Sequence, residues 1–145
     1  MNKIDALVAG EPPPGLYRFA SRAQPDNLAQ ELAERGWRCF WLDGGKIDDK
    51  ASFLRACAEA MQFPDYFGRN WDALEECLTD LSWVQAEGYV LLYDQVARFV
   101  AAEPDQWSTA REILDGAVAS WGRAGTPLYV LLRGTAGRLP DLPRF

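Results

Sequence analysis

The stretch "GYVLLYD", residues 88–94, decides the fold class of this chain because every position between its glycine and its aspartate is apolar or aromatic. An unbroken run of this kind, with glycine before it, is typical of a strand buried on both faces of a sheet. The same pattern recurs in "TPLYVLLRG", residues 126–134, and "WRCFWLDGG", residues 37–45, predicts a third buried strand. Strands of this type occur in parallel sheets that are covered by helices.

Helical patterns lie between these runs. Residues 25–36 start with Pro and Asp and stop at a glycine, and residues 48–61 carry an apolar stripe at helical spacing. Further helices are predicted at residues 71–81, 95–104 and 105–125. The chain is therefore expected to have an α/β fold, with a small parallel β-sheet of three strands packed with helices; "LYRF", residues 16–19, would add a fourth strand.

The composition excludes several classes of function. The 145-residue chain has no histidine, which removes Ser-His and Cys-His nucleophilic machinery and most zinc sites. Its three cysteines match no metal-binding spacing and are expected to be buried, reduced thiols. A net charge of −6 weighs against nucleic acid as a direct ligand. We therefore expect no catalytic activity, no metal and no cofactor.

No membrane or targeting segment is predicted. The apolar runs are far shorter than the roughly 18 residues of a membrane-spanning helix. The first residues lack the charged-then-apolar layout of a secretory signal. We expect a cytoplasmic protein without a membrane partner. The sequence says little about oligomeric state, and a monomer is the expectation for the free chain.

The segment "DYFGRNWDALEECLTDL", residues 65–81, predicts a helix with one apolar and one acidic face. Asn70 suits the N-cap, since its side-chain oxygen can accept a hydrogen bond from a free amide of the first turn. The apolar face comprises Trp71, Leu74, Leu78 and Leu81, with Cys77 beside it. The other face carries Asp72, Glu75, Glu76, Thr79 and Asp80.

Two interpretations of the acidic face stay open. It can be an ordinary solvated surface, and the helix dipole favours Asp72 in the first turn without any partner. Against this, Asp72–Glu76 and Glu76–Asp80 are like-charged pairs four residues apart, each repelling by about 0.2–0.5 kcal/mol. Arg69 is the only cation that we expect nearby. Clustering of one sign has a cost, which favours a docking surface for a basic partner.

The loop before this helix holds Tyr66, Phe67 and Gly68. Gly68 is expected to adopt a positive φ, which glycine tolerates. The two aromatic residues can pack the loop or serve as anchors beside the charged patch, as is common at the energetic centres of interfaces. The two roles are compatible.

The stretch "YFGRNWDALEECL", residues 66–78, resembles the signature of the barstar family, small cytoplasmic inhibitors of secreted bacterial ribonucleases. An aromatic pair, a glycine, an asparagine, the triplet Asp-Ala-Leu and a final Cys-Leu all fall in place. The resemblance covers about residues 37–134. Residues 1–36 are therefore expected to form an N-terminal extension whose strand and helix pack on a barstar-like domain of residues 37–145.

The resemblance implies inhibition by occlusion, in which the loop and the acidic helix block the active site of a basic ribonuclease and carboxylates take the places of RNA phosphates. Asp72 and Glu76 would be the main phosphate mimics. The chain departs from the family's pattern at Arg69, Glu75, Glu76 and Ser120, which leaves the target ribonuclease open. The implied partner-binding residues are Tyr66, Phe67, Gly68, Asn70, Asp72, Glu75, Glu76, Thr79 and Asp80.

Two other functions stay under consideration. A barstar-like fold could serve as an interaction module for a non-nuclease protein, which the additional residues 1–36 and the serine at position 120 suggest. A divalent-metal hydrolase could use Asp72, Glu75 and Glu76 as ligands, but no histidine or second acidic cluster closes such a site.

Overall fold

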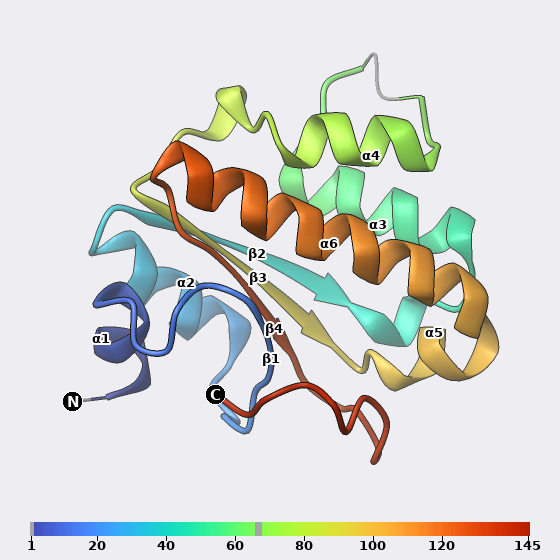
Figure 1. The fold of residues 1–145 in the computed structure, drawn as a ribbon, viewed down its shortest axis with the longest axis horizontal. Helices are drawn as coiled ribbons and strands as arrows, with labels where there is room; N and C mark the ends of the chain where they lie inside the picture. The colour runs from blue at the N-terminus through green and yellow to red at the C-terminus, as the bar shows by residue number, and fades with distance from the viewer. Residues whose placement is uncertain (1, 66–67) are drawn as a thin grey trace.

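The computed structural model describes residues 2–65 and 68–145 and contains one sheet of four parallel strands (Figure 1). The order across the sheet is β1-β4-β3-β2, so the first two strands in the chain form the two edges. The predicted α/β fold with a parallel sheet is confirmed, and residues 16–18 do supply the fourth strand. The strands are β1 (Leu16–Arg18), β2 (Trp37–Asp43), β3 (Gly88–Asp94) and β4 (Leu128–Leu132).

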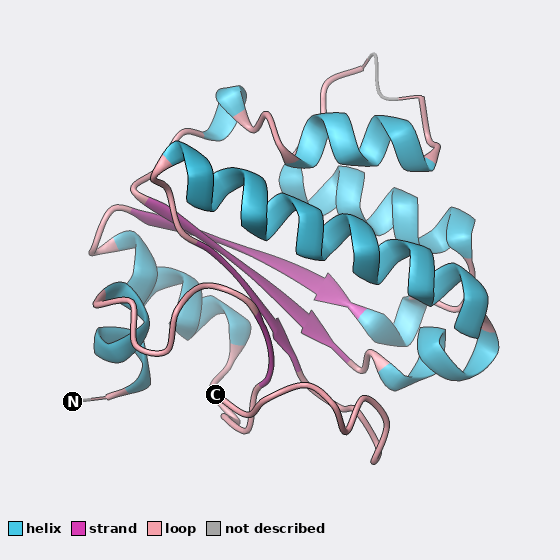
Figure 2. Ribbon diagram, viewed as in Figure 1, coloured by secondary structure: helices cyan, strands magenta, loops and turns pink. Residues whose placement is uncertain are grey.

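Helices cover both faces of the sheet (Figure 2). Helices α1 and α2 pack on one face, and α3, α4, α5 and α6 lie on the other. Two short 3-10 turns, η1 and η2, join these elements. The helices are α1 (Lys3–Val8), α2 (Pro25–Ala33), α3 (Lys50–Met61), α4 (Trp71–Leu78), α5 (Ala97–Ala102) and α6 (Pro104–Ala124), and the turns are η1 (Gly44–Lys46) and η2 (Ser82–Val84).

The central strands β3 and β4 are buried on both faces, as their unbroken apolar sequences predict. Val90 and Leu92 point into the core under α1 and α2, whereas Leu91 and Tyr93 point into the core under the other helices. Gly88 opens β3 for a packing reason, since a Cβ placed there would lie 2.5 Å from the Trp37 ring. These two strands form the part of the sheet that water does not reach.

Strand β2 is correctly placed but is not the fully buried strand that its sequence predicts. It lies at the edge of the sheet and pairs with β3. Arg38 is exposed, and 45% of Trp41 is accessible to solvent. An aromatic-rich sequence does not distinguish an edge strand from a central one, because strand order depends on contacts between residues far apart in the chain.

Residues 2–36 form more structure than the sequence predicts. Helix α1 was not expected, because six residues give too short a periodic signal. Its start is nevertheless marked, since Asn2 accepts a hydrogen bond from the Asp5 amide at 2.8 Å and Ile4 and Leu7 are buried. An asparagine followed by two apolar residues three positions apart was the available signal.

The C-terminal tail is irregular, as expected, but it packs firmly against β1. The Arg18 amide donates to the Pro143 carbonyl at 2.8 Å, and the Phe145 amide donates to the Arg18 carbonyl at 2.8 Å. Leu139 and Leu142 of the tail are buried. The tail therefore covers the outer edge of β1.

Candidate functional site

Helix α4 begins as its sequence predicts. The Asn70 side-chain oxygen accepts a hydrogen bond from the Ala73 amide at 2.7 Å, which makes Asn70 the N-cap. Arg69, the residue directly after Gly68, adopts a positive φ of 52°. A left-handed residue directly before the extended N-cap turns the chain into the helix. Gly68 leaves room for the capping side chain, since a Cβ there would lie 3.3 Å from Nδ2 of Asn70.

The apolar face of α4 fixes the helix on the body of the protein. Leu74, Cys77 and Leu78 are buried, and the half-buried Trp71 ring packs on Phe53 with 5.9 Å between ring centroids. The Trp121 indole of α6 donates a hydrogen bond to the Leu78 carbonyl at 2.9 Å, which satisfies a free carbonyl in the last turn. The helix is thus held on α3 and α6 before any partner arrives.

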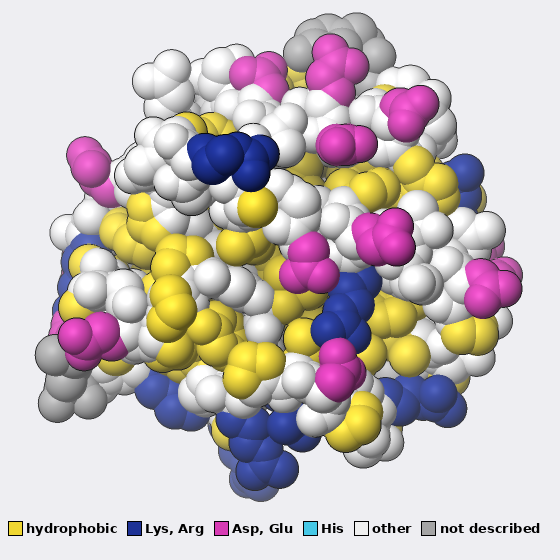
Figure 3. All heavy atoms as spheres, in the orientation of Figure 1, with side chains coloured by type: hydrophobic (Ala, Val, Ile, Leu, Met, Phe, Trp, Pro, Cys, Tyr) yellow, Lys and Arg dark blue, Asp and Glu magenta, His cyan; other side chains and the backbone are white. Residues whose placement is uncertain are grey.

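The opposite face of α4 leaves its carboxylates in water. Asp72, Glu75 and Glu76 are exposed, and none of them forms an ion pair within residues 2–65 and 68–145. Figure 3 shows acidic side chains gathered at the end of the molecule where α4 lies. We call Asp72, Glu75, Glu76 and Asp80 the acidic patch.

The helix is shorter than predicted, and this changes the geometry of the acidic patch. Helix α4 ends at Leu78, and Asp80 lies beyond it in a turn. Leu81 adopts a left-handed conformation (φ 48°) that returns the chain to the core and buries its side chain. Asp80 is exposed, but it does not form the predicted helical pair with Glu76.

Thr79 is the C-cap residue of α4 and is half-buried. Its hydroxyl donates to the Glu75 carbonyl at 2.8 Å, so this group is already used in ending the helix. This bond favours a structural role for the Thr79 side chain over the partner contact that the resemblance implies.

A second cation lies close to α4, contrary to the expectation that Arg69 stands alone. The Lys50 ammonium at the start of α3 lies 5.3 Å from the centre of the Trp71 ring, within the range of a cation–π contact. Lys50 and Arg69 both flank the N-terminal end of α4. The site therefore has a positive margin at one end and carboxylates along its length.

The structure brings together most of the predicted site residues. Gly68, Asn70 and the residues of the acidic patch follow one another along the loop and helix on one side of the protein. Tyr66 and Phe67, the two predicted aromatic anchors, lie outside the described residues. Ser120, where the resemblance implies a carboxylate in the family, is half-buried on α6.

The three cysteines are free thiols, as expected, but Cys39 on the edge strand β2 is half-buried, whereas Cys57 and Cys77 are buried. Burial raises the pKa of Cys77, and the neighbouring Glu76 and Asp80 carboxylates raise this pKa further. Burial also raises the pKa of Cys57, and it raises that of Cys39 to about 12 although the Arg133 charge opposes the change. Thiols held in their neutral form are poor nucleophiles and metal ligands.

Sequence reasoning missed a second polar cluster, at the carboxyl ends of the strands. Arg133 follows β4 and forms a two-pronged ion pair with Asp94 at the end of β3, with 2.8 Å between Nη2 and Oδ2. Trp41 of β2 donates its indole N–H to the same Asp94 oxygen at 2.8 Å. The available signal was a charged residue at the end of each apolar run, since carboxyl ends of parallel strands meet at one edge of the sheet.

Two kinds of feature are absent from the part of the chain that the structure describes. There, no three His, Cys, Asp or Glu side chains lie close enough to hold a metal ion. None of the described helices combines the length and apolar character needed to cross a membrane. The exposed carboxylates of α4 can accept hydrogen bonds and make charge contacts.

An α/β protein that displays carboxylates along a fixed helix has the features of a protein-binding module. The family model of Barstar, described as barnase inhibitor, matches residues 37–133, and the chain belongs to this family. The family is one of inhibitors and not of catalysts. A search of curated proteins found no match to this chain. The matched range includes α4 and three of the four strands, whereas α1, β1 and α2 lie before it.

Proposed function

We propose that this protein inhibits a basic ribonuclease by inserting α4 and the loop before it into the RNA-binding cleft. The observation that carries the proposal is the acidic patch, whose members are exposed and have no cation partner among the described residues. A ribonuclease cleft is built to hold a polyanion. Carboxylates on a fixed helix would occupy the positions of the RNA phosphates.

The way α4 is held favours tight binding. Its N-cap bond at Asn70 and its contacts with Phe53 and Trp121 order the helix in the free protein. Because the ordering cost is met on folding, less binding free energy is lost on association. Opposite charges on the two proteins would also raise the association rate at low salt. Association should therefore slow markedly as salt is added.

The direct test measures RNA cleavage by a panel of secreted basic ribonucleases, with and without this protein at equimolar concentration. We expect strong inhibition of at least one enzyme. Asp72→Asn and Glu76→Gln keep the side-chain shapes but remove charge, and each should raise the inhibition constant at least tenfold. Glu112→Gln, on an exposed part of α6, is the matched control and should change the constant less than twofold.

Two results would contradict the proposal. Cleavage that continues unchanged across the whole panel would reject ribonuclease inhibition. Inhibition that persists in both Asp72→Asn and Glu76→Gln would keep the function but move the interface away from α4.

The sequence-based expectation of a cytoplasmic location belongs to the same proposal. The free thiols of Cys39, Cys57 and Cys77 are consistent with a reducing compartment.

A second candidate is a module that binds a non-nuclease protein. The observation in its favour is that residues 1–36, outside the family match, supply the edge strand β1 and the helices of one sheet face.

We propose that this segment is an extension that completes the domain. Deleting residues 1–36 would uncover Val90, Leu92 and Tyr129, so residues 37–145 alone should aggregate; a soluble, cooperatively folded fragment would contradict this.

A further inference from the structure

The two edge strands of the sheet, β1 and β2, differ in length and in whether their outer backbone is hydrogen-bonded. Strand β1 has three residues, and the tail residues Pro143 and Phe145 bond to its backbone. Strand β2 has seven residues in unbroken register with β3 and contains no proline. Throughout residues 2–65 and 68–145, no backbone hydrogen bond reaches the outer side of β2. Proteins normally shield edges of this length, because the free N–H and C=O groups pair with other strands.

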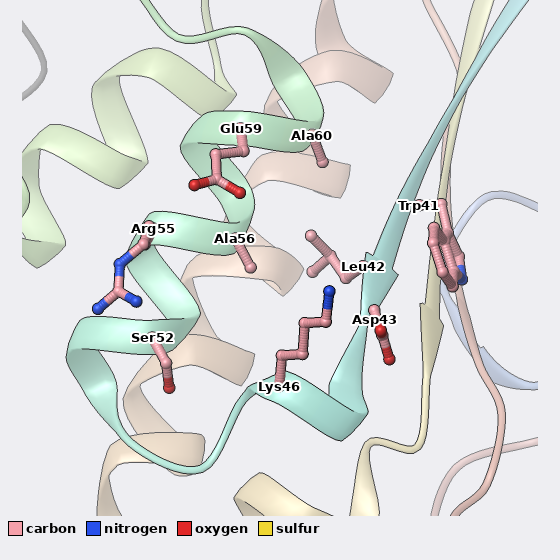
Figure 4. A pocket seen from close by; sticks show the side chains of 9 residues that line it. All are labelled: Trp41, Leu42, Asp43, Lys46, Ser52, Arg55, Ala56, Glu59 and Ala60. Carbon is pink, nitrogen blue, oxygen red and sulfur yellow. The ribbon is translucent and has the colours of Figure 1, made fainter.

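A hollow lies on each face of the sheet beside β2. On the α3 side, a pocket of about 500 Å³ lies between the helix and the strand; Figure 4 shows Leu42 and Lys46 directed into it from β2 and η1, and Ala56 from α3. On the α2 side, a second pocket of about 500 Å³ is bounded by Trp41 and the Asp94–Arg133 pair. Side chains of an added strand alternate between the two faces, so each set would meet one pocket.

Trp41 is suited to act as a platform in the second pocket. Its side chain is among the few large apolar groups exposed in the described chain, at 45% of its surface. Its indole N–H is bonded to Asp94, which fixes the ring orientation. A fixed aromatic ring beside a free strand edge provides a contact for an apolar side chain at low entropic cost.

Cations slightly outnumber carboxylates beside β2 on the α3 side. The net charge of the chain is −6, yet the charged groups next to this edge are the exposed Arg38, Lys46, Arg55 and Glu59 and the half-buried Asp43. Nowhere in the described ranges does any of the five form an ion pair. The central carbon of the Arg38 guanidinium lies 5.7 Å from the centre of the Phe40 ring. Hydrogen bonds with Ser52 lower the pKa of Asp49, and the Arg55 charge makes a smaller contribution in the same direction.

We propose that the free edge of β2 binds an extended segment of a partner protein that carries carboxylates at every second position and apolar side chains between them. The segment adds to the sheet as a fifth strand, and its backbone pairs with β2. Its carboxylates face Arg38, Lys46 and Arg55, and its apolar side chains lie on Trp41. This surface does not involve the acidic patch, so the proposal stands apart from ribonuclease inhibition.

The test is an NMR titration of the ¹⁵N-labelled protein with a capped seven-residue peptide that alternates glutamate with valine. We expect amide shift changes confined to residues 37–43 and to the lining of the two pockets. The same peptide with lysine in place of glutamate should bind at least tenfold more weakly. Two peptides with alternate backbone amides methylated distinguish strand addition from charge contact alone, since only one of them keeps the N–H groups that face β2.

Protein variants complete the test. Lys46→Gln and Arg55→Gln should each weaken binding about threefold to tenfold, as expected for partly solvated charges. Trp41→Thr, which keeps a good strand-forming residue on an exposed position, should weaken it further. The matched control Glu112→Gln should leave the affinity unchanged. The spectrum of β3 and β4 shows whether each variant is folded.

Three outcomes of the peptide titration would overturn the proposal. These are no shift change at millimolar peptide, changes that map away from β2, and equal binding of both methylated peptides. Sedimentation of the free protein as a dimer that Trp41→Thr dissociates would also overturn it, because the edge would then belong to a second copy.

Discussion

Two clusters of charge in this protein use the same kinds of side chain in opposite ways. At the carboxyl ends of the strands, Asp94 is 18% exposed and is held by Arg133 and by the Trp41 indole. On α4, Asp72 and Glu76 are exposed and have no cation partner in the described structure. A carboxylate withdrawn from water needs donors within the fold, whereas one left in water does not. The first cluster therefore serves stability, and the second is free for a partner.

The largest effect in this comparison is expected from Arg133→Leu. It leaves Asp94 partly buried without its cation and also removes the bonds from Arg133 to the Ser21 and Ala23 carbonyls. We expect the free energy of unfolding to fall by about 2–3 kcal/mol, somewhat less than for a fully buried pair. Asp72→Asn should change it by less than about 0.5 kcal/mol. Urea unfolding of both variants measures the contrast, and equal losses would contradict it.

The second prediction concerns pH. Burial alone would raise the pKa of Asp94, but hydrogen bonds from Arg133 and Trp41 and the Arg133 charge lower it below its ordinary value. The unfolded chain therefore binds this proton more readily than the folded one. The stabilisation is complete above the unfolded pKa of about 3.9 and is lost as the pH falls through the lower folded pKa.

Urea midpoints of the wild type and of Asp94→Asn, measured from pH 7 down to pH 3, check this prediction. The wild type should have the higher urea midpoint at neutral pH, and the difference between the two midpoints should narrow below about pH 4. A gap that stays constant across this range would mean that the Asp94 charge contributes nothing.

A smaller effect is expected from Asn70→Ala, which removes the N-cap of α4. The lost hydrogen bond to the Ala73 amide should cost about 1 kcal/mol of stability. If the acidic patch is the binding surface, the variant should lose more free energy of binding to the ribonuclease than free energy of unfolding, because the start of α4 would fray. Thermal unfolding and the inhibition assay provide the two numbers, with Asn70→Ser as the control that retains a capping oxygen.

The smallest effect should have the opposite sign. Glu76→Lys relieves the repulsion with Asp72 one turn earlier and places a cation near the C-terminal end of the helix dipole. We expect a gain of about 0.3–0.5 kcal/mol in stability, together with the loss of ribonuclease inhibition. A variant that is both less stable and fully inhibitory would show that the acidic patch is neither self-repelling nor functional.

The sequence predicted those parts of the structure that depend on local pattern. Strands β3 and β4, helix α3 and the Asn70 cap follow from unbroken apolar runs, a helical stripe and a capping residue. Helical spacing placed Asp72, Glu75 and Glu76 on one face of a helix, whereas Asp80 lies beyond its end. In each case a few neighbouring residues carry the physical cause.

Some features were not predicted. The end of α4 at Leu78 is followed by a left-handed turn at Leu81, which the apolar spacing does not reveal because Leu81 continues the helical stripe. The edge position of β2 depends on distant residues, since it is set by strand order. The Trp41, Asp94 and Arg133 cluster joins three strands that are separated by some 40 to 50 positions in the chain. Single-sequence patterns contain no information on such pairings.

The packing of the tail against β1 has a practical consequence for handling the protein. Lys3 donates a hydrogen bond to the Phe145 carbonyl at 3.3 Å, so the first and last described segments lie together, away from α4 (Figure 1). A biotin or a fluorophore attached at either position would emerge on the same side. Coupled to a sensor chip in this way, every molecule would present the acidic helix to the flowing solution in one orientation.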